Sequence, residues 1–213
     1  MKIGILGSGD VAKALAKGFA GRGDEVKLGT RDSKKLADWL KTAGPKASVG
    51  SFADAAKFGE LVVLATLWTG TENAIKLADP TNFAGKVVID ATNPLDFSRG
   101  MPPRLALGHT DSGGEQIQRW LPDARVVKAF NIVGHAHMVH PQFPGGPPDM
   151  FIAGNDAAAK ETVNGILKSF GWQGSIDVGG IEGARLLEPL CILWVIYGAT
   201  TGGWNHAFKM VKK

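Results

Sequence analysis

Residues 1–16 read MKIGILGSGDVAKALA, and this stretch decides the fold. The apolar run at 3–6 predicts a strand, the glycines after it predict a tight turn, and the following residues favour a helix. Gly7 permits the turn, Gly9 lets the backbone approach a pyrophosphate, and Ala12 permits close packing of helix on strand. This order favours a dinucleotide site over an incidental turn. The residues predicted to face the dinucleotide here are Gly7, Ser8, Gly9, Asp10 and Val11.

Strands and helices alternate along the rest of the chain. The predicted strands are 25–29, 46–49, 61–65, 86–90, 125–130, 150–153 and 175–178. The predicted helices are 33–43, 51–57, 72–78, 115–120, 157–170 and 182–197. The alternation predicts an α/β fold, a Rossmann-like, doubly wound, mostly parallel sheet. We expect a small C-terminal α/β extension that ends in an apolar helix.

Two irregular segments rich in proline and glycine interrupt this alternation, at 93–114 and 134–148. Loops of this length inside a compact domain are usually functional or mobile. The second segment indicates an approximate domain boundary near residue 140. We therefore predict a nucleotide-binding domain over 1–140 and a small domain over 141–213.

Composition excludes several classes of protein. The 213 residues are 44% apolar and carry a formal net charge of +4, which is typical of an ordinary globular protein. No uncharged apolar stretch reaches the roughly 18 residues of a membrane span, so we expect no membrane association and a cytoplasmic location. Basic residues cluster only at 209–213, so no nucleic-acid partner is expected. Cys191, the only cysteine, lies in an apolar setting typical of a buried structural thiol.

The residues after the second predicted strand indicate which dinucleotide binds. An NAD site would have an acidic residue at this strand end to hold the ribose 2′-hydroxyl. Here Thr30 and Arg31 occupy the position, and Lys35 follows one helical turn later. A hydroxyl and a guanidinium suit a 2′-phosphate, so we predict NADP(H). Asp32 keeps NAD open as an alternative, and a merely solvated basic helix start is another.

The ends of three later strands should meet the rest of the cofactor, because ligands bind at the carboxyl ends of parallel strands. The Trp68 ring could form a wall of the cofactor site or lie only at the rim of that site. Asn93 offers donors and an acceptor for a carboxamide or ribose, although an Asn-Pro turn without a ligand is the alternative. Lys128 could be only a structural ion-pair member. The residues predicted to bind the cofactor here are Thr66, Leu67, Trp68, Asn93, Pro94, Ala129, Phe130 and Asn131.

The chain lacks an obvious set of residues for proton transfer. Tyr197, the only tyrosine, lies in the apolar C-terminal helix. His135, His137 and His140 stand close together, but no acidic residue or cysteine lies near them in the sequence, so we expect no metal site. A substrate contact by His135 or His137 is an alternative. The absence of an acid–base set favours direct hydride exchange between two bound redox cofactors, which needs positioning more than proton transfer.

Six motifs occur in an order that resembles one family, the coenzyme F-420 (F420)-dependent NADP oxidoreductases: GILGSGDVAKALA, GTRDSKK, LATLW, DATNPL, VVKAFN and ARLLEPLCILW. The resemblance implies a Rossmann domain, a small C-terminal domain that closes the cleft, and a homodimer. It implies NADP held by the glycine turn, Thr30, Arg31 and Lys35. It also implies a deazaflavin over the nicotinamide, with Asn93, Phe130 and Asn131 at the reacting end.

Two further resemblances keep other second substrates open. The segment DFSRGMPPRLALGHTDSGGEQIQRW is similar to a bacterial subgroup of dinucleotide-binding enzymes. The N-terminal half also resembles the reductase domain of membrane metalloreductases, which pass hydride from NADPH to a flavin. The alternatives are therefore an NADPH-dependent reductase of FMN or FAD, a reductase of a small imine or carbonyl compound, and a non-catalytic sensor of NADP(H).

Overall fold

The predicted strands and helices are present in a computed structural model, which describes residues 1–211 of the chain. The strands are β1 (Lys2–Leu6), β2 (Glu25–Gly29), β3 (Ala47–Gly50), β4 (Leu61–Leu64), β5 (Val87–Asp90), β6 (Leu95–Asp96), β7 (Arg104–Leu105), β8 (Arg125–Lys128), β9 (Met150–Gly154) and β10 (Ser175–Asp177). The α-helices are α1 (Asp10–Gly21), α2 (Ala37–Thr42), α3 (Phe52–Phe58), α4 (Trp68–Ala78), α5 (Gly113–Trp120), α6 (Ala157–Ser169) and α7 (Ala184–Thr201). Lys212 and Lys213, the end of the predicted C-terminal domain, lie outside the described residues.

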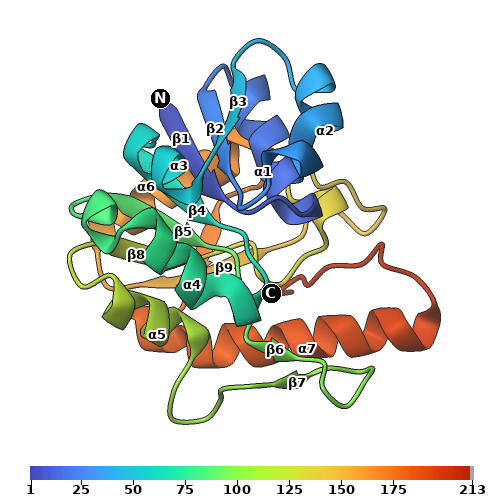
Figure 1. Cartoon of the computed structure of the whole chain (residues 1–213). Coiled ribbons are helices and arrows are strands. Elements are labelled where there is room, and N and C mark those ends of the chain that lie inside the picture. Colours follow the sequence, from blue (N-terminus) through green and yellow to red (C-terminus); the bar gives the residue numbers. More distant parts are fainter. Residues whose placement is uncertain (212–213) are drawn as a thin grey trace.

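Within the described residues, eight strands form one sheet in the order β10-β9-β8-β5-β4-β1-β2-β3 (Figure 1). The sheet strands β8, β5, β4, β1, β2 and β3 pair in parallel, whereas β9 pairs antiparallel with β8. The predicted doubly wound, mostly parallel α/β sheet is therefore confirmed. Because β1 lies between β4 and β2, the glycine turn after β1 opens at the middle of the sheet edge.

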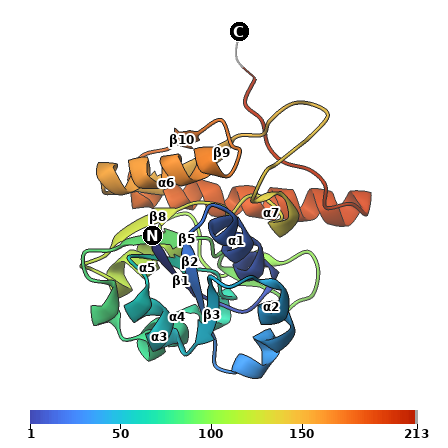
Figure 2. The same cartoon turned by 90° about the horizontal axis from the view of Figure 1, so that it is seen from above.

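Helices cover both faces of the sheet and bury two apolar cores (Figure 2). Side chains of α1 and α6 pack on one face, and those of α3, α4 and α5 pack on the other. Helix α3 approaches β1 closely, since a Cβ on Gly4 would lie 2.1 Å from the carbonyl oxygen of Ala55. Only glycine fits at this crossing.

Four regions differ from the sequence-based prediction. The helix predicted over 33–43 begins as a 3-10 turn (Ser33–Leu36), and α2 spans only Ala37–Thr42. Helix α4 begins at Trp68 rather than at residue 72, although its first turn holds two threonines and a glycine. That turn is stabilised because the Thr71 hydroxyl donates to the carbonyl of Leu67 and the Trp68 ring stacks on Trp120. The segment predicted to be irregular contains the short antiparallel pair β6 and β7. Helix α7 extends to Thr201, four residues past the predicted end.

The C-terminal extension continues the same sheet. Strand β9 pairs with β8, and β10 pairs in parallel with β9. Helix α7 closes the extension and packs against α5 and β7 (Figure 1). Strands on both sides of residue 140 thus belong to one sheet, and the division into domains 1–140 and 141–213 stays a prediction. Over residues 1–211, no helix is both long enough and apolar enough to cross a bilayer.

Candidate nucleotide-binding site

The glycine turn after β1 has the geometry that the sequence predicts. Gly7 has a φ of +145°, and its N–H donates to the carbonyl of Gly29 at 3.0 Å. A Cβ on Gly7 would lie 2.4 Å from the carbonyl oxygen of Ala65 and 3.3 Å from Cβ of Ala12. Glycine is therefore required, and the ends of β1, β2 and β4 are held together at this turn.

Gly9 leaves the space that a pyrophosphate needs. It is the N-cap residue of α1, and no described side chain caps the first turn of this helix. A Cβ on Gly9 would meet nothing within 4 Å, so the backbone is open to a ligand. Uncapped N–H groups and the positive end of the helix dipole favour an anion. Ser8, Asp10 and Val11 are at least partly exposed beside it, and the turn fits a dinucleotide.

The residues after β2 separate into a buried hydroxyl and two exposed cations. Thr30 is buried, and its Oγ1 accepts a hydrogen bond from the N–H of Asp32 at 3.2 Å. Arg31 and Lys35 are exposed. The carboxylate of Asp32, the residue that left NAD open, accepts the N–H of Lys34 at 3.0 Å. That carboxylate is therefore already engaged within its own turn.

The residues after β4 form the start of α4. The hydroxyls of Thr66 and Thr71 lie 2.8 Å apart, and Leu67 is 80% exposed. The Trp68 ring stacks on Trp120 of α5, with ring centroids 5.6 Å apart and planes at 22°. Trp68 thus packs sideways against α5, which agrees better with a rim residue than with a wall.

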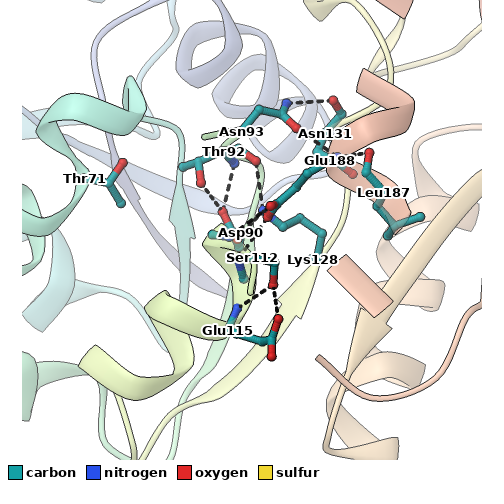
Figure 3. A network of polar contacts seen from close by, with 12 residues as sticks. Thr71, Asp90, Thr92, Asn93, Ser112, Glu115, Lys128, Asn131, Leu187 and Glu188 are labelled. Carbon is teal, nitrogen blue, oxygen red and sulfur yellow. Dashed lines mark hydrogen bonds and ion pairs between the residues drawn. The ribbon is translucent and has the colours of Figure 1, made fainter. Parts of the chain in front are cut away.

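Asn93 and Asn131 were predicted to bind the cofactor from the ends of two separate strands. In the structure they hydrogen-bond to each other (Figure 3). Nδ2 of Asn93 donates to the carbonyl of Asn131 at 2.8 Å, and Nδ2 of Asn131 donates to Oδ1 of Asn93 at 3.0 Å. Nδ2 of Asn131 also donates to the carbonyl of Leu187 in α7 at 2.9 Å. Oδ1 of Asn131 is buried without a hydrogen-bond partner among the described residues. We call these two residues the asparagine pair.

The neighbours of the asparagine pair are buried. Pro94 and Ala129 are buried beside it. The Phe130 ring is fully buried, with its centroid 6.1 Å from that of Phe170 in the core. Phe130 has a φ of +64°, and its N–H lies 3.3 Å from Sδ of Met150. The structure therefore places the Phe130 ring in the core and only its backbone at the strand end.

A fully buried ion-pair group lies next to the asparagine pair (Figure 3). Nζ of Lys128 lies 2.6 Å from Oδ2 of Asp90 and 2.8 Å from Oε1 of Glu188, and it donates to the carbonyl of Thr92 at 3.0 Å. Burial lowers the pKa of Lys128, but the two carboxylates outweigh burial and hold it above its ordinary value. Lys128 is thus the ion-pair member that the sequence suggested. We call Asp90, Lys128 and Glu188 the buried charge cluster.

Glu188 is the site residue that sequence reasoning missed. Its carboxylate accepts the N–H groups of Gly113 and Gly114, at 2.9 and 3.0 Å, and so caps helix α5. One turn away, Arg185 donates to Glu115 at 2.8 Å. A lone carboxylate in the apolar segment around residue 188 was the available signal, because buried charges need partners.

The histidines and the cysteine lie in separate parts of the structure. Nε2 of His137 lies 3.1 Å from Oδ1 of Asn205, whereas His140 lies against Gly171. His135 lines a groove of about 770 Å³ between α1 and α2. Across residues 1–211, no three histidine, cysteine, aspartate or glutamate side chains gather as metal ligands. Cys191 is buried, which raises the pKa of its thiol to about 12, so the predicted structural thiol is confirmed.

Comparisons with known proteins agree with the predicted family. The model of the family described as "NADP oxidoreductase coenzyme F420-dependent" matches residues 2–94. An F420-dependent NADP reductase of Methanocaldococcus jannaschii is 31% identical over 206 residues, which cover 92% of this chain and 91% of that protein. The metalloreductase STEAP3 of Rattus norvegicus is 31% identical over 189 residues, 89% of this chain. The chain spans only 36% of the length of STEAP3.

A solved structure agrees along the whole chain. The crystal structure of a proposed F420-dependent NADP reductase from Arthrobacter sp. FB24 superimposes with a TM-score of 0.95. It is 44% identical, and the match covers 100% of both chains.

The glycine turn can be tested by a substitution that spares the fold. We expect Gly9→Ala to leave the melting temperature unchanged, because its Cβ has open space. NADPH affinity should fall at least about tenfold, since the methyl group occupies the space of the pyrophosphate. Calorimetric titration with NADPH measures this loss. Gly165→Ala in α6, also in open space, is the matched control; unchanged affinity in Gly9→Ala would contradict the placement.

Proposed function

Because the chain belongs to the family of coenzyme F420-dependent NADP oxidoreductases, we propose that it is an NADP-dependent oxidoreductase whose second substrate is the deazaflavin coenzyme F420. The observation that carries the nucleotide half of this proposal is the glycine turn, where Gly9 leaves an uncapped helix N-terminus open to a pyrophosphate. The deazaflavin half rests on the family. NADP(H) supplies a hydride, which passes directly between the nicotinamide and the deazaflavin ring. The protein binds and orients the two cofactors and excludes water.

The side chains then have separate tasks. Arg31 and Lys35 hold the 2′-phosphate, and Thr30 stiffens the turn that carries Arg31 through its hydrogen bond with Asp32. NADP is favoured over NAD because Arg31 and Lys35 both lie exposed where the 2′-phosphate is expected. Thr66, Leu67 and Pro94 border the nicotinamide ribose. These assignments follow from the strand ends at which the residues lie.

The asparagine pair orients the nicotinamide at the ends of β5 and β8. Asn93 is partly exposed and can contact the carboxamide or ribose, whereas Asn131 is buried behind it. Asn131 therefore acts through Asn93, which it holds in place by donating to its Oδ1. Through Ala129 and Phe130, only the backbone serves the site.

Purified protein, NADPH and coenzyme F420 test the activity directly. We expect the absorption bands of NADPH and of oxidised deazaflavin to fall together, because one hydride passes from one ring to the other. FMN and FAD, in place of the deazaflavin, are the comparison substrates. Oxidation of NADPH by a flavin but not by the deazaflavin would contradict the proposal and favour a flavin reductase.

Cofactor choice depends on Arg31. We expect Arg31→Ala to weaken NADPH binding by roughly 10- to 100-fold, because a charge-assisted contact of about 1.5–3 kcal/mol is lost. NADH lacks the 2′-phosphate, so its dissociation constant should stay nearly unchanged. Calorimetric titration of both nucleotides measures the difference. Lys41→Ala, an exposed lysine of α2, is the control, and equal losses for NADPH and NADH would refute the assignment.

We also propose that the chain forms a homodimer through α7. The exposed side of this helix is mostly apolar, and the partly exposed Arg185 at its start is paired with Glu115. The exposed residues are Leu186, Pro189, Leu193, Ile196, Tyr197, Ala199, Thr200 and Thr201. Leu186 is 67% exposed and Leu193 is 54% exposed. The opposite side of α7 is buried in the fold and is apolar apart from Glu188, so most of the helix surface is apolar, which is typical of a helix buried on every side.

A second copy of the chain is the occupant that this surface fits. The exposed stripe offers no charge for a charged partner to complement. Next to it lies a groove of about 600 Å³, which is lined by apolar residues such as Leu105, Leu107 and Pro189 and, at its edge, by Glu182 and Arg185. A ridge beside a groove on one face can be self-complementary, as a two-fold dimer requires.

Leu193 tests this dimer. We expect the wild-type chain to sediment at twice its 22.5 kDa mass and Leu193→Glu to sediment as a monomer, because a buried unpaired carboxylate opposes the contact. Sedimentation equilibrium measures both masses. Leu77→Glu in α4, where the leucine is 52% exposed, is the matched control. A monomeric wild type, or a dimeric Leu193→Glu, would count against the interface.

A further inference from the structure

We propose that the net negative charge of the buried charge cluster favours the oxidised, positively charged form of the nicotinamide over its neutral reduced form. This inference rests on the proposed function, which places the nicotinamide at the asparagine pair. Asp90, Lys128 and Glu188 would thus act on the reaction without touching either cofactor.

The contacts of the cluster establish its charge. Both carboxylates face donors: Asp90 accepts the N–H and O–H of Thr92 at 2.9 and 2.7 Å, and Glu188 accepts two backbone N–H groups. Both also meet the ammonium of Lys128. Each carboxylate oxygen faces an ammonium or a backbone N–H, which can only donate, so these contacts favour the ionised form of both carboxyl groups. Two carboxylates and one ammonium leave one net negative charge.

Burial protects this net negative charge from screening by water. The side chains of Asp90 and Lys128 are 0% exposed, and that of Glu188 is 1% exposed, so water cannot screen them. Helix α5 contributes a partial positive charge at its N-terminus, where Glu188 accepts the N–H groups of Gly113 and Gly114. That helix end is worth roughly half a unit charge, which reduces the net negative charge without cancelling it.

The cluster and the asparagine pair share one piece of structure (Figure 3). Asp90 ends β5 and Lys128 ends β8, and each precedes its asparagine by three residues. The carbonyl of Thr92, the neighbour of Asn93, accepts from Lys128. Leu187, the neighbour of Glu188, accepts from Asn131. A ring oriented by the asparagines would therefore lie close to the cluster.

The charge of the nicotinamide changes during the proposed reaction. A reduced nicotinamide is neutral; when a hydride, two electrons and one proton, leaves for the deazaflavin, the nicotinamide ring gains one positive charge. The deazaflavin accepts the hydride and takes one proton from water. A nearby negative charge stabilises the positive ring and the transition state that leads to it. The same charge should raise affinity for NADP⁺ relative to NADPH.

Nucleotide binding tests the inference without turnover. We expect Glu188→Gln to raise the ratio of the NADP⁺ to the NADPH dissociation constant by about tenfold, the effect of one charge roughly 10 Å away at an effective dielectric constant of about 20. Glu188→Asp keeps the charge and should leave the ratio within about twofold of wild type. Calorimetric titrations with NADP⁺ and NADPH measure both constants.

Controls separate charge from damage to the fold. Glu182→Gln removes an exposed, solvent-screened carboxylate, and its ratio should equal that of wild type. If Glu188→Gln raises the dissociation constants of NADP⁺ and NADPH by the same factor, their ratio stays unchanged and the inference is overturned. Loosened packing would produce this result, because both nucleotides carry the same phosphates.

The wild-type chain provides a test that needs no variant to fold. It should bind NADP⁺ at least as tightly as NADPH; a preference for NADPH of more than about tenfold, some 1.4 kcal/mol, would overturn the inference. Wild-type protein that binds neither nucleotide would instead refute the proposed function, so the two failures are distinguishable.

Discussion

The ammonium of Lys128 is the group on which the rest of the site depends. An unpaired charge at 0% exposure costs several kcal/mol, so the fold must bring carboxylates to it. One comes from β5, next to β8 in the sheet, and the other comes from α7. Satisfying Lys128 therefore fixes the end of β5, the start of α5 and the first turns of α7 relative to one another. These three elements therefore set the positions of the two residues of the asparagine pair.

This constraint explains why the C-terminal helix belongs to the site. Leu187 and Glu188 are adjacent in α7, and each contacts a different strand end: the carbonyl of Leu187 holds Asn131, and the carboxylate of Glu188 holds Lys128. The opposite side of the same helix is apolar and exposed. Helix α7 thus connects the buried charge cluster to the surface that we assign to a second chain. A substitution on either side of the helix should therefore affect the contacts of the other side.

Local patterns predicted most of the fold, because the alternation of strands and helices and the glycine turn depend on short stretches of sequence. The conformational demand on Gly7 follows from its place between a strand and a helix. Contacts between distant residues were harder to predict. Asn93 and Asn131 were assigned to one region from their strand ends, but the capping of α5 by Glu188 joins residues far apart in the chain. The Phe130 ring lies in the core because its positive φ turns the side chain away from the direction that strand alternation predicts.

The separation of Lys128 from Glu188 along the chain also has a consequence for biosynthesis. The ribosome makes the strands of the nucleotide-binding half first, and Lys128 can then meet only Asp90. Glu188 is made later, in the final helix. A nascent chain halted before α7 would hold a buried cation with one of its two carboxylates, together with an uncapped helix α5. The region around Lys128 can therefore reach its final packing only after α7 has left the ribosome, although most strands of the sheet are made before it.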